Sequence, residues 1–460
     1  MYSRKQIKSS EAGQPHGRRF SLSSSLTESP SAANKSSSTP LRPLHSNFER
    51  VIIVALGIVF ILPILVHFWA VFKYGLNIPF WDDFDTVFSF LIKYLDAGTI
   101  FEKLQLVFAQ HTEHRFALNK IITLLNYYIS NIDFKLLLII GNLALIGVLA
   151  ILYRSCTILK NKLFLLIPIT LLIFQPQYNE SIYWATAALA NFYILLFAFL
   201  SIFLLSKNKK LYFYLSIIFA LFATFTMGNG LFVFPVGLAI LVYQKRYREA
   251  VIWFLVTVAI FVSYFHNYIS SAGHPSLVQA LLNPLNTIIH FFTLIGAPFG
   301  SLHPNLLPFS IYVGILIVLY FIYLTIRSYF KKNLVIYSFF LFLLITVFVI
   351  AFTRSGFGIE QAFSSKYTIV GILFYILSYI SFIEIFPFMQ KKKFVFVFIV
   401  ISLAFNVVSY YSNFKYIKDH HDSLVDSMEE WRKNKTGLLY PDQERANKLL
   451  IEAIEKNIYK

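Results

Sequence analysis

The chain is poor in charged residues and in cysteine. Charged residues make up 14% of its 460 residues, only 23 residues are acidic, and Cys156 is the single cysteine. One cysteine cannot close a disulfide within the chain or build a Cys-based metal cluster, so both are excluded. Hydrophobic residues reach 57%, with 50 Phe and 28 Tyr, which is typical of a polytopic membrane protein. The net charge of +17 then indicates basic cytoplasmic loops and not nucleic-acid binding.

Residues 1–48 lack apolar runs altogether. The stretch "SLSSSLTESPSAANKSSSTPLRP" is rich in Ser and Pro and has almost nothing to bury, which predicts disorder. It also lacks the apolar core and the small-residue cleavage site of a signal peptide. Its excess of Lys and Arg over Glu favours a cytoplasmic N-terminus.

Beyond this tail, apolar stretches near the length of a membrane-spanning helix follow one another. Two of them, 163–175 and 231–243, are short for a full span. We expect an all-α polytopic bundle of about eleven transmembrane helices, at 51–72, 134–153, 163–175, 185–205, 211–227, 231–243, 250–266, 309–326, 334–353, 367–388 and 394–413.

The distribution of basic residues orients these spans. Lys and Arg gather in five short loops, near Arg154, Lys207, Lys245, Arg327 and Lys391. The intervening segments 176–188, 228–230 and 267–308 contain neither. The positive-inside rule therefore predicts a cytoplasmic N-terminus and an extracytoplasmic C-terminus.

Two further apolar segments cannot cross the membrane in this arrangement. Residues 116–131 and 277–297 would each invert the topology of everything downstream. We expect both to lie at the outer surface or to dip partly into the bilayer. The chain then divides into a tail (1–48), a transmembrane domain (49–413) whose first outer loop is 73–133, and a small extracytoplasmic helical tail (414–460).

Three acidic residues open the first outer loop. The stretch "NIPFWDDFDTVFSF" places Asp82, Asp83 and Asp85 at the outer end of the first span. A carboxylate in a half-buried cleft can act as a general base, since desolvation and nearby charge tune its pKa. Asp85, three residues after Asp82, fits a cap of the following helix.

Other polar residues of the outer face gather in a few clusters. Basic residues there could hold a phosphate, with Arg as the better bidentate partner. This combination predicts a transferase that takes a group from a lipid-linked phosphate. A metal site on two i, i+3 histidines is a weaker interpretation than ordinary hydrogen-bonded histidines. The clustered residues are His111, Glu113, His114, Arg115, Glu180, Arg354, Lys366 and Tyr367.

The order of these motifs resembles a known group of membrane enzymes. "PFWDDFD", "HTEHR", "QPQYNESIYW", "GNG" and "RSGFG" followed by "SSKY" are similar to largely uncharacterised bacterial proteins of the GT-C glycosyltransferase superfamily. More distantly, the chain resembles protein O-mannosyltransferases and the aminoarabinose transferases of lipid A. The resemblance covers about residues 50–460. Two positions depart from the group's H-N-E-H-R and S-R-Y motifs: Thr112 replaces Asn, and Lys366 replaces Arg.

The resemblance implies an inverting glycosyltransferase of the bacterial inner (plasma) membrane. Its donor would be a polyprenyl-phosphate-linked sugar, and its acceptor a hydroxyl of a cell-envelope glycan, lipid or protein. Asp82 matches the first acid of the superfamily's acidic pair and is the expected base, with Asp83 as the close alternative. No cofactor is required, and a divalent metal is compatible with the chemistry.

The resemblance also implies roles for the other polar residues of the outer face. Arg115, Arg354 and Lys366 would bind the donor phosphate, and Tyr367 is a further substrate-binding candidate. The acceptor would be ordered, or the base supported, by His111, His114, Glu113 and Glu180.

Three other functions stay open at this point. A polysaccharide polymerase or ligase also combines many spans with outer-face Arg residues, but segment 267–308 contains no Arg. A membrane transporter would favour broken helices, internal repeats and carboxylates at mid-membrane. A non-catalytic scaffold is the third alternative.

Overall fold

The structure is a computed structural model that describes residues 45–158, 162–270 and 277–460. Residues up to Arg50 separate from the compact unit Val51–Lys460, and the latter is described here by itself. Of the predicted disordered tail 1–48, only residues 45–48 are described, and they begin helix α1 (His45–Tyr74). The rest of that tail lies outside the described residues.

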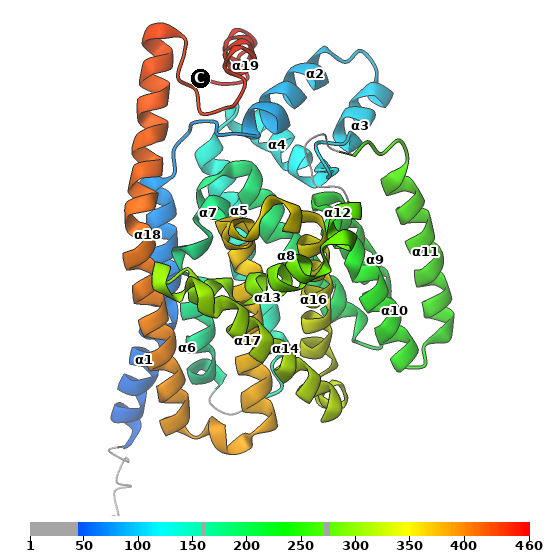
Figure 1. The fold of residues 1–460 in the computed structure, drawn as a ribbon, viewed down its shortest axis with the longest axis vertical. Helices are drawn as coiled ribbons and strands as arrows, with labels where there is room; N and C mark the ends of the chain where they lie inside the picture. The colour runs from blue at the N-terminus through cyan, green and yellow to red at the C-terminus, as the bar shows by residue number, and fades with distance from the viewer. Residues whose placement is uncertain (1–44, 159–161, 271–276) are drawn as a thin grey trace, which may run out of the picture. The chain divides into compact units, whose positions relative to one another are not determined.

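The described residues form helices and no strand, which confirms the all-α class (Figure 1). Within these ranges, eight helices are long and apolar enough to cross a membrane. They are α1, from Val54 on, α5 (Phe134–Ser155), α8 (Ala185–Leu205), α11 (Tyr247–Phe265), α14 (Ser310–Ile326, with the 3-10 turn from Pro304), α16 (Leu334–Arg354), α17 (Ser365–Ile385) and α18 (Lys392–Asn434).

The other three predicted spans form helices that are shorter. They are α6 (Lys162–Ile173, 12 residues), α9 (Lys210–Thr226, 17 residues) and α10 (Val233–Tyr243, 11 residues). A 3-10 turn, Gly228–Phe232, takes up the residues before α10. At 1.5 Å per residue, a helix of about 20 residues is needed for a bilayer core of about 30 Å. The multi-pass architecture therefore stands, whereas the count of eleven spans does not follow from helix length.

The two segments that we expected not to cross form separate short helices. Residues 116–131 become α4 (Ala117–Ser130), and 277–297 fall in α12 (Leu277–Leu282) and α13 (Pro284–Gly300). None of the three is among the eight candidate spans. Helices α2 (Phe90–Asp96), α3 (Ile100–Phe108) and α4 form a helical layer at one end of the unit (Figure 1).

Helix α8 packs closely against α5 near its first turn. Gly141 of α5 lies against Ala188 of α8, where an added Cβ would come within 2.5 Å of the Ala188 Cβ. Small residues at such a crossing let two helix backbones approach closely inside a membrane. Ala188 lies in the first turn of α8, so the crossing also holds this turn in place. The same turn contains Thr186, which contacts the candidate site described below.

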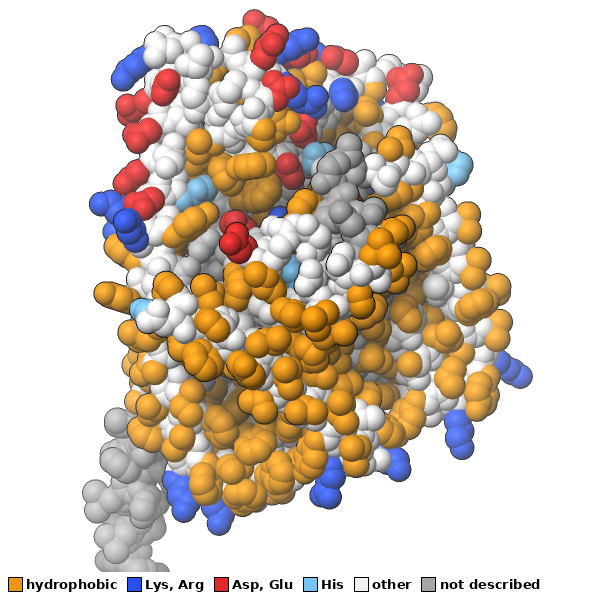
Figure 2. Space-filling model, viewed as in Figure 1, with side chains coloured by type: hydrophobic (Ala, Val, Ile, Leu, Met, Phe, Trp, Pro, Cys, Tyr) orange, Lys and Arg blue, Asp and Glu red, His pale blue; other side chains and the backbone are white. Residues whose placement is uncertain are grey.

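Charged side chains separate between the two ends of the unit. On the face shown in Figure 2, the charged side chains seen at the lower end are Lys and Arg, whereas acidic and basic side chains mix at the upper end. A broad apolar surface lies between them. The separation agrees with the basic loops on which the predicted orientation rests.

The C-terminal part does not begin at residue 414. Helix α18 continues without a break to Asn434, beside α1, where the Tyr74 and Phe414 rings lie 6.1 Å apart (Figure 1). Lys435 (φ 58°) and Gly437 (φ 90°) then reverse the chain, and α19 (Gln443–Glu455) folds back. The predicted tail is thus a helical extension of the last span followed by one short helix.

Candidate functional site

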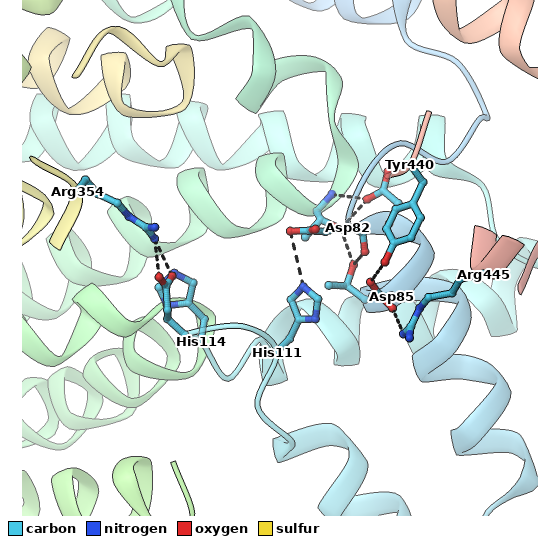
Figure 3. A network of polar contacts seen from close by, with 11 residues as sticks. Asp82, Asp85, His111, His114, Arg354, Tyr440 and Arg445 are labelled. Atoms are coloured by element: carbon cyan, nitrogen blue, oxygen red, sulfur yellow. Dashed lines mark hydrogen bonds and ion pairs between the residues drawn. The ribbon is translucent and has the colours of Figure 1, made fainter. Parts of the chain in front are cut away.

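The acidic turn lies just after α1, where the chain enters the π-helical segment η1 (Phe84–Ser89). Its three carboxylates have three different environments, as Figure 3 shows for Asp82 and Asp85. π-helical turns are rare and are frequent at functional sites.

Asp83 points into the core, where its side chain is held by hydrogen bonds. Its Oδ1 accepts from the Thr186 N–H (3.0 Å) and the Thr186 hydroxyl (2.5 Å), and its Oδ2 accepts from the Phe80 N–H (3.1 Å). The residue is 1% exposed. Burial raises the pKa of Asp83 to about 7, against the hydrogen bonds, which favour the ionised form. Asp83 therefore anchors the turn to the start of α8.

Asp85 points to the C-terminal part of the chain. Its Oδ2 accepts a hydrogen bond from the Tyr440 hydroxyl (2.6 Å), and its Oδ1 forms an ion pair with Arg445. The carboxylate does not cap a helix, which was the role expected from its position. The reason is that its partners, far along the chain, satisfy both oxygens.

Asp82 has the most accessible carboxylate of the three. Its side chain is 34% exposed, and its Oδ2 lies 3.6 Å from the His111 Nε2 (Figure 3). Across the part of the chain that the structure describes, the Asp82 carboxylate accepts no hydrogen bond, and the buried His111 Nε2 has no hydrogen-bond partner either. Of the two predicted candidates for the base, Asp82 is thus the one open to a substrate.

A tight turn connects His111 to a second cluster. The His111 N–H donates to the His114 carbonyl (2.7 Å), and the His114 N–H donates back to the His111 carbonyl (2.9 Å). Between them Thr112 has a φ of 49°, in the left-handed region. The side chains of His111 and His114 therefore project from the same short turn, which also carries Glu113.

Arg115 holds this turn in place. Its Nε, Nη1 and Nη2 atoms donate to the carbonyl oxygens of Tyr264 (2.8 Å), Phe108 (2.8 Å) and His266 (2.5 Å). These contacts tie the turn to the end of α11 and of α3. We assign Arg115 a structural role, because its three nitrogens are already engaged and phosphate binding would compete with these carbonyls.

His114 is held neutral by its surroundings. Its Nδ1 accepts from the Gly228 N–H (3.3 Å), so the proton of the neutral ring lies on Nε2, 3.8 Å from Glu113. Burial lowers the pKa of His114 to about 4, and the charges of Arg354 and Lys366 act in the same direction. A side chain at Gly228 would come within 3.2 Å of the His114 ring, so glycine fits this position.

The second cluster contains an ion pair and a further cation. The Arg354 Nη2 donates to both Glu113 oxygens, at 2.8 and 2.7 Å. Lys366 lies close enough for its charge to act on His114, and its Nζ lies 5.4 Å from the centre of the Tyr367 ring. Among the described residues, no carboxylate forms an ion pair with Lys366.

Glu180 ties α7 (Asn179–Tyr183) to the start of α17. Its Oε2 accepts from the Ser364 hydroxyl and from the Lys366 N–H, both at 3.3 Å, and the Glu180 N–H donates to the Ser365 hydroxyl (3.0 Å). The structure therefore places Glu180 beside the backbone of Lys366 and not beside Asp82. Its contacts position the loop that carries Lys366.

Apart from Arg115 and Glu180, the predicted residues form two connected groups. Asp82, Asp83 and His111 make up the acidic group, and Glu113, His114, Arg354, Lys366 and Tyr367 make up the cationic group. Thr186, Tyr440 and Arg445 were not predicted. Across residues 45–158, 162–270 and 277–460, no set of three or more His, Cys, Asp or Glu side chains is arranged to hold a metal ion. Compared with known proteins, the chain matches no protein-family model, no curated protein and no solved structure.

Proposed function

We propose that this multi-pass membrane protein is an inverting glycosyltransferase. It moves a sugar from a polyprenyl-phosphate donor to a hydroxyl of a cell-envelope glycan, lipid or protein. The observation that supports it best is the position of Asp82, an accessible carboxylate without a hydrogen bond, 3.6 Å from His111. The turn that carries His111 leads directly to the cationic group.

The chemistry follows from the two groups. The Asp82 carboxylate accepts the proton of the acceptor hydroxyl, and the oxygen attacks the anomeric carbon of the donor. The bond from that carbon to the phosphate oxygen breaks, and both of its electrons leave with the polyprenyl phosphate. Lys366 and Arg354 stabilise the negative charge that develops on the leaving phosphate. Attack opposite to the leaving group inverts the anomeric centre.

His111 and Asp83 support this role of Asp82. His111 lies against the Asp82 carboxylate, and its unpaired Nε2 is placed to contact the acceptor or to stabilise the carboxylate. Asp83 is engaged by Thr186 and Phe80, so its oxygens are less available to a hydroxyl. We therefore assign the base to Asp82 and the anchoring of the turn to Asp83.

The proposed orientation places this site on the extracytoplasmic side of the bacterial inner membrane. In that orientation the basic loops around Arg154, Lys207, Lys245, Arg327 and Lys391 face the cytoplasm, and the first outer loop with Asp82 and His111 faces the other side. The N-terminus is then cytoplasmic and the C-terminus extracytoplasmic.

A donor assay tests the proposal. Purified protein in proteoliposomes is given a panel of polyprenyl-phosphate monosaccharides, with membrane glycan extract as acceptor, and release of polyprenyl phosphate is measured. We expect release from one donor, with Asp82→Asn inactive and Lys448→Ala, an exposed Lys of α19, as active as the wild type. No release from any donor, together with no binding of polyprenyl phosphate, would contradict the proposal.

A further inference from the structure

The C-terminal segment, residues 435–460, is joined to the first outer loop at several points besides Asp85. These contacts pair main-chain groups of the loop with groups of the segment. They are Trp81 N–H to Leu439 O (3.1 Å), Ile132 N–H to Ile458 O (2.8 Å) and Tyr459 hydroxyl to Asn77 O (2.5 Å). The segment therefore contacts the loop both before and after the acidic turn.

The contacts on Asp85 are the most specific of them. The Tyr440 hydroxyl donates to its Oδ2, and the Arg445 guanidinium pairs with its Oδ1 (Figure 3). The Tyr440 ring also lies 5.4 Å from the Phe84 ring. Hydrogen bonds to a charged carboxylate are about twice as strong as neutral ones. Tyr440 and Arg445 thus fix the side of the turn that is opposite to the core.

The core side of the turn is fixed by Thr186. Besides holding Asp83, its Oγ1 lies 2.6 Å from the Thr86 hydroxyl. The Asp82 carbonyl in turn accepts from the Asp85 N–H (3.0 Å) and from the Thr86 N–H (2.7 Å) and hydroxyl (2.8 Å). Asp82 therefore lies between two anchors, and neither of them contacts its carboxylate.

We propose that Tyr440 and Arg445 are positioning residues for Asp82, acting through Asp85, and that the C-terminal segment is part of the site. The inference rests on the proposed function, in which Asp82 is the base. By pairing with Asp85, the two residues hold the backbone from Trp81 to Thr86. They keep the Asp82 carboxylate beside His111 while its oxygens stay open to substrate. A base that is displaced by about 1 Å can cost roughly 10²-fold in rate.

The test compares the double variant Tyr440→Phe/Arg445→Ala with Lys448→Ala. Both alter the C-terminal segment, but Lys448 is exposed and pairs with no described residue. Hydrogen–deuterium exchange of amides 81–86 reports on the turn, and steady-state kinetics report kcat and donor KM separately. We expect exchange in the turn to rise about tenfold or more in the double variant. Its kcat should fall at least tenfold with donor KM unchanged, and Arg445→Lys should retain most of the kcat.

The outcomes separate this inference from the proposed function. Unchanged exchange, or raised exchange with a normal kcat, would overturn the positioning role while the transferase proposal stands. A fall in kcat that Lys448→Ala reproduces would overturn it as well. If the wild type neither releases polyprenyl phosphate from any donor nor binds polyprenyl phosphate, the proposed function fails. Raised exchange confined to the double variant would then still support the anchoring of the turn.

Discussion

The His111 Nε2 and the Asp82 Oδ2 lie 3.6 Å apart, and neither atom has a hydrogen-bond partner among the residues described. The separation is too long for a direct hydrogen bond and short enough for strong electrostatic coupling. A hydroxyl that binds both atoms would satisfy a buried nitrogen and an accessible carboxylate together. This relationship is the basis for assigning Asp82 and His111 to the acceptor side of the site.

Replacing Asp82 by Asn is expected to abolish most of the transfer. The amide keeps the shape of the side chain but not its basicity, so kcat should fall by roughly 10² or more while the protein still folds. Asp83→Asn should reduce the kcat of the folded fraction much less, because Asp83 is engaged by Thr186. Initial rates of transfer, divided by the amount of monodisperse protein in each sample, measure both effects. Loss of transfer in Asp83→Asn with retention in Asp82→Asn would reassign the base.

The stability of the protein should depend on the pH through Asp83. Its folded-state pKa of about 7 lies above the ordinary value of 3.8, so the folded state binds the extra proton between these values. Stability from this group is complete below about pH 4 and is lost as the pH rises through 7, by up to about 4 kcal/mol. Thermal unfolding in nanodiscs at pH 5 and pH 8 measures the part of this loss that lies above pH 5, about 3 kcal/mol. Asp83→Asn should reduce the difference, and an equal difference in that variant would exclude Asp83 as its source.

Much of the architecture could be predicted because apolar runs report directly on membrane burial. The boundaries of α5, α8 and α17 lie within a few residues of the predicted spans. Helix length was less predictable where local turns intervene, as at Gly228–Phe232 before α10. The continuation of α18 past residue 413 was missed because its sequence changes from apolar to polar without a helix-breaking residue. A change from apolar to polar residues predicts where a helix leaves the bilayer, but it does not predict where the helix ends.

The sequence motifs named residues that the structure brings near one another, but they did not reveal how those residues pair. The short motifs around Asp82, His111 and Arg354 indicated which residues gather. Thr186, Tyr440 and Arg445 lie 103, 355 and 360 residues from the acids that they hold, and no local pattern links such partners. Motif content could also not reveal that the three nitrogens of Arg115 donate to carbonyl oxygens, which only the tertiary structure brings together.

Lys366 should contribute more than Arg354 to donor binding. The sequence favours Arg354, because a guanidinium binds phosphate in bidentate fashion. In the structure Glu113 already neutralises Arg354, whereas Lys366 forms no ion pair with a described residue. We expect Lys366→Ala to raise donor KM at least tenfold, Arg354→Ala to raise it less, and Lys366→Arg to keep it near normal. Donor titrations of the three variants measure these KM values. An unchanged KM in Lys366→Ala would mean that Lys366 does not bind the donor and serves as a membrane-interface anchor.

Thr112→Asn should stabilise the protein. Thr112 has a φ of 49°, and the left-handed region costs β-branched residues roughly 1–2 kcal/mol more than it costs Gly. Asn tolerates this region, so the variant should gain about 1 kcal/mol and a higher apparent Tm without a change in kcat. Thr112→Val is the matched control, because it is β-branched and should bring no gain. A lower Tm for Thr112→Asn would mean that the Thr side chain makes a stabilising contact that outweighs the backbone strain.

The two ends of α18 should lie on opposite sides of the membrane. The helix has 43 residues, which at 1.5 Å per residue is about 65 Å, twice the bilayer core of about 30 Å. In a Cys156→Ser background, a membrane-impermeant maleimide should label Glu429→Cys in sealed cells and Lys392→Cys only after lysis. Both side chains are exposed, so accessibility on each side is comparable. The reverse pattern would place Asp82 on the cytoplasmic side. An extracytoplasmic transfer reaction would then be excluded, because the base and its donor would face opposite compartments.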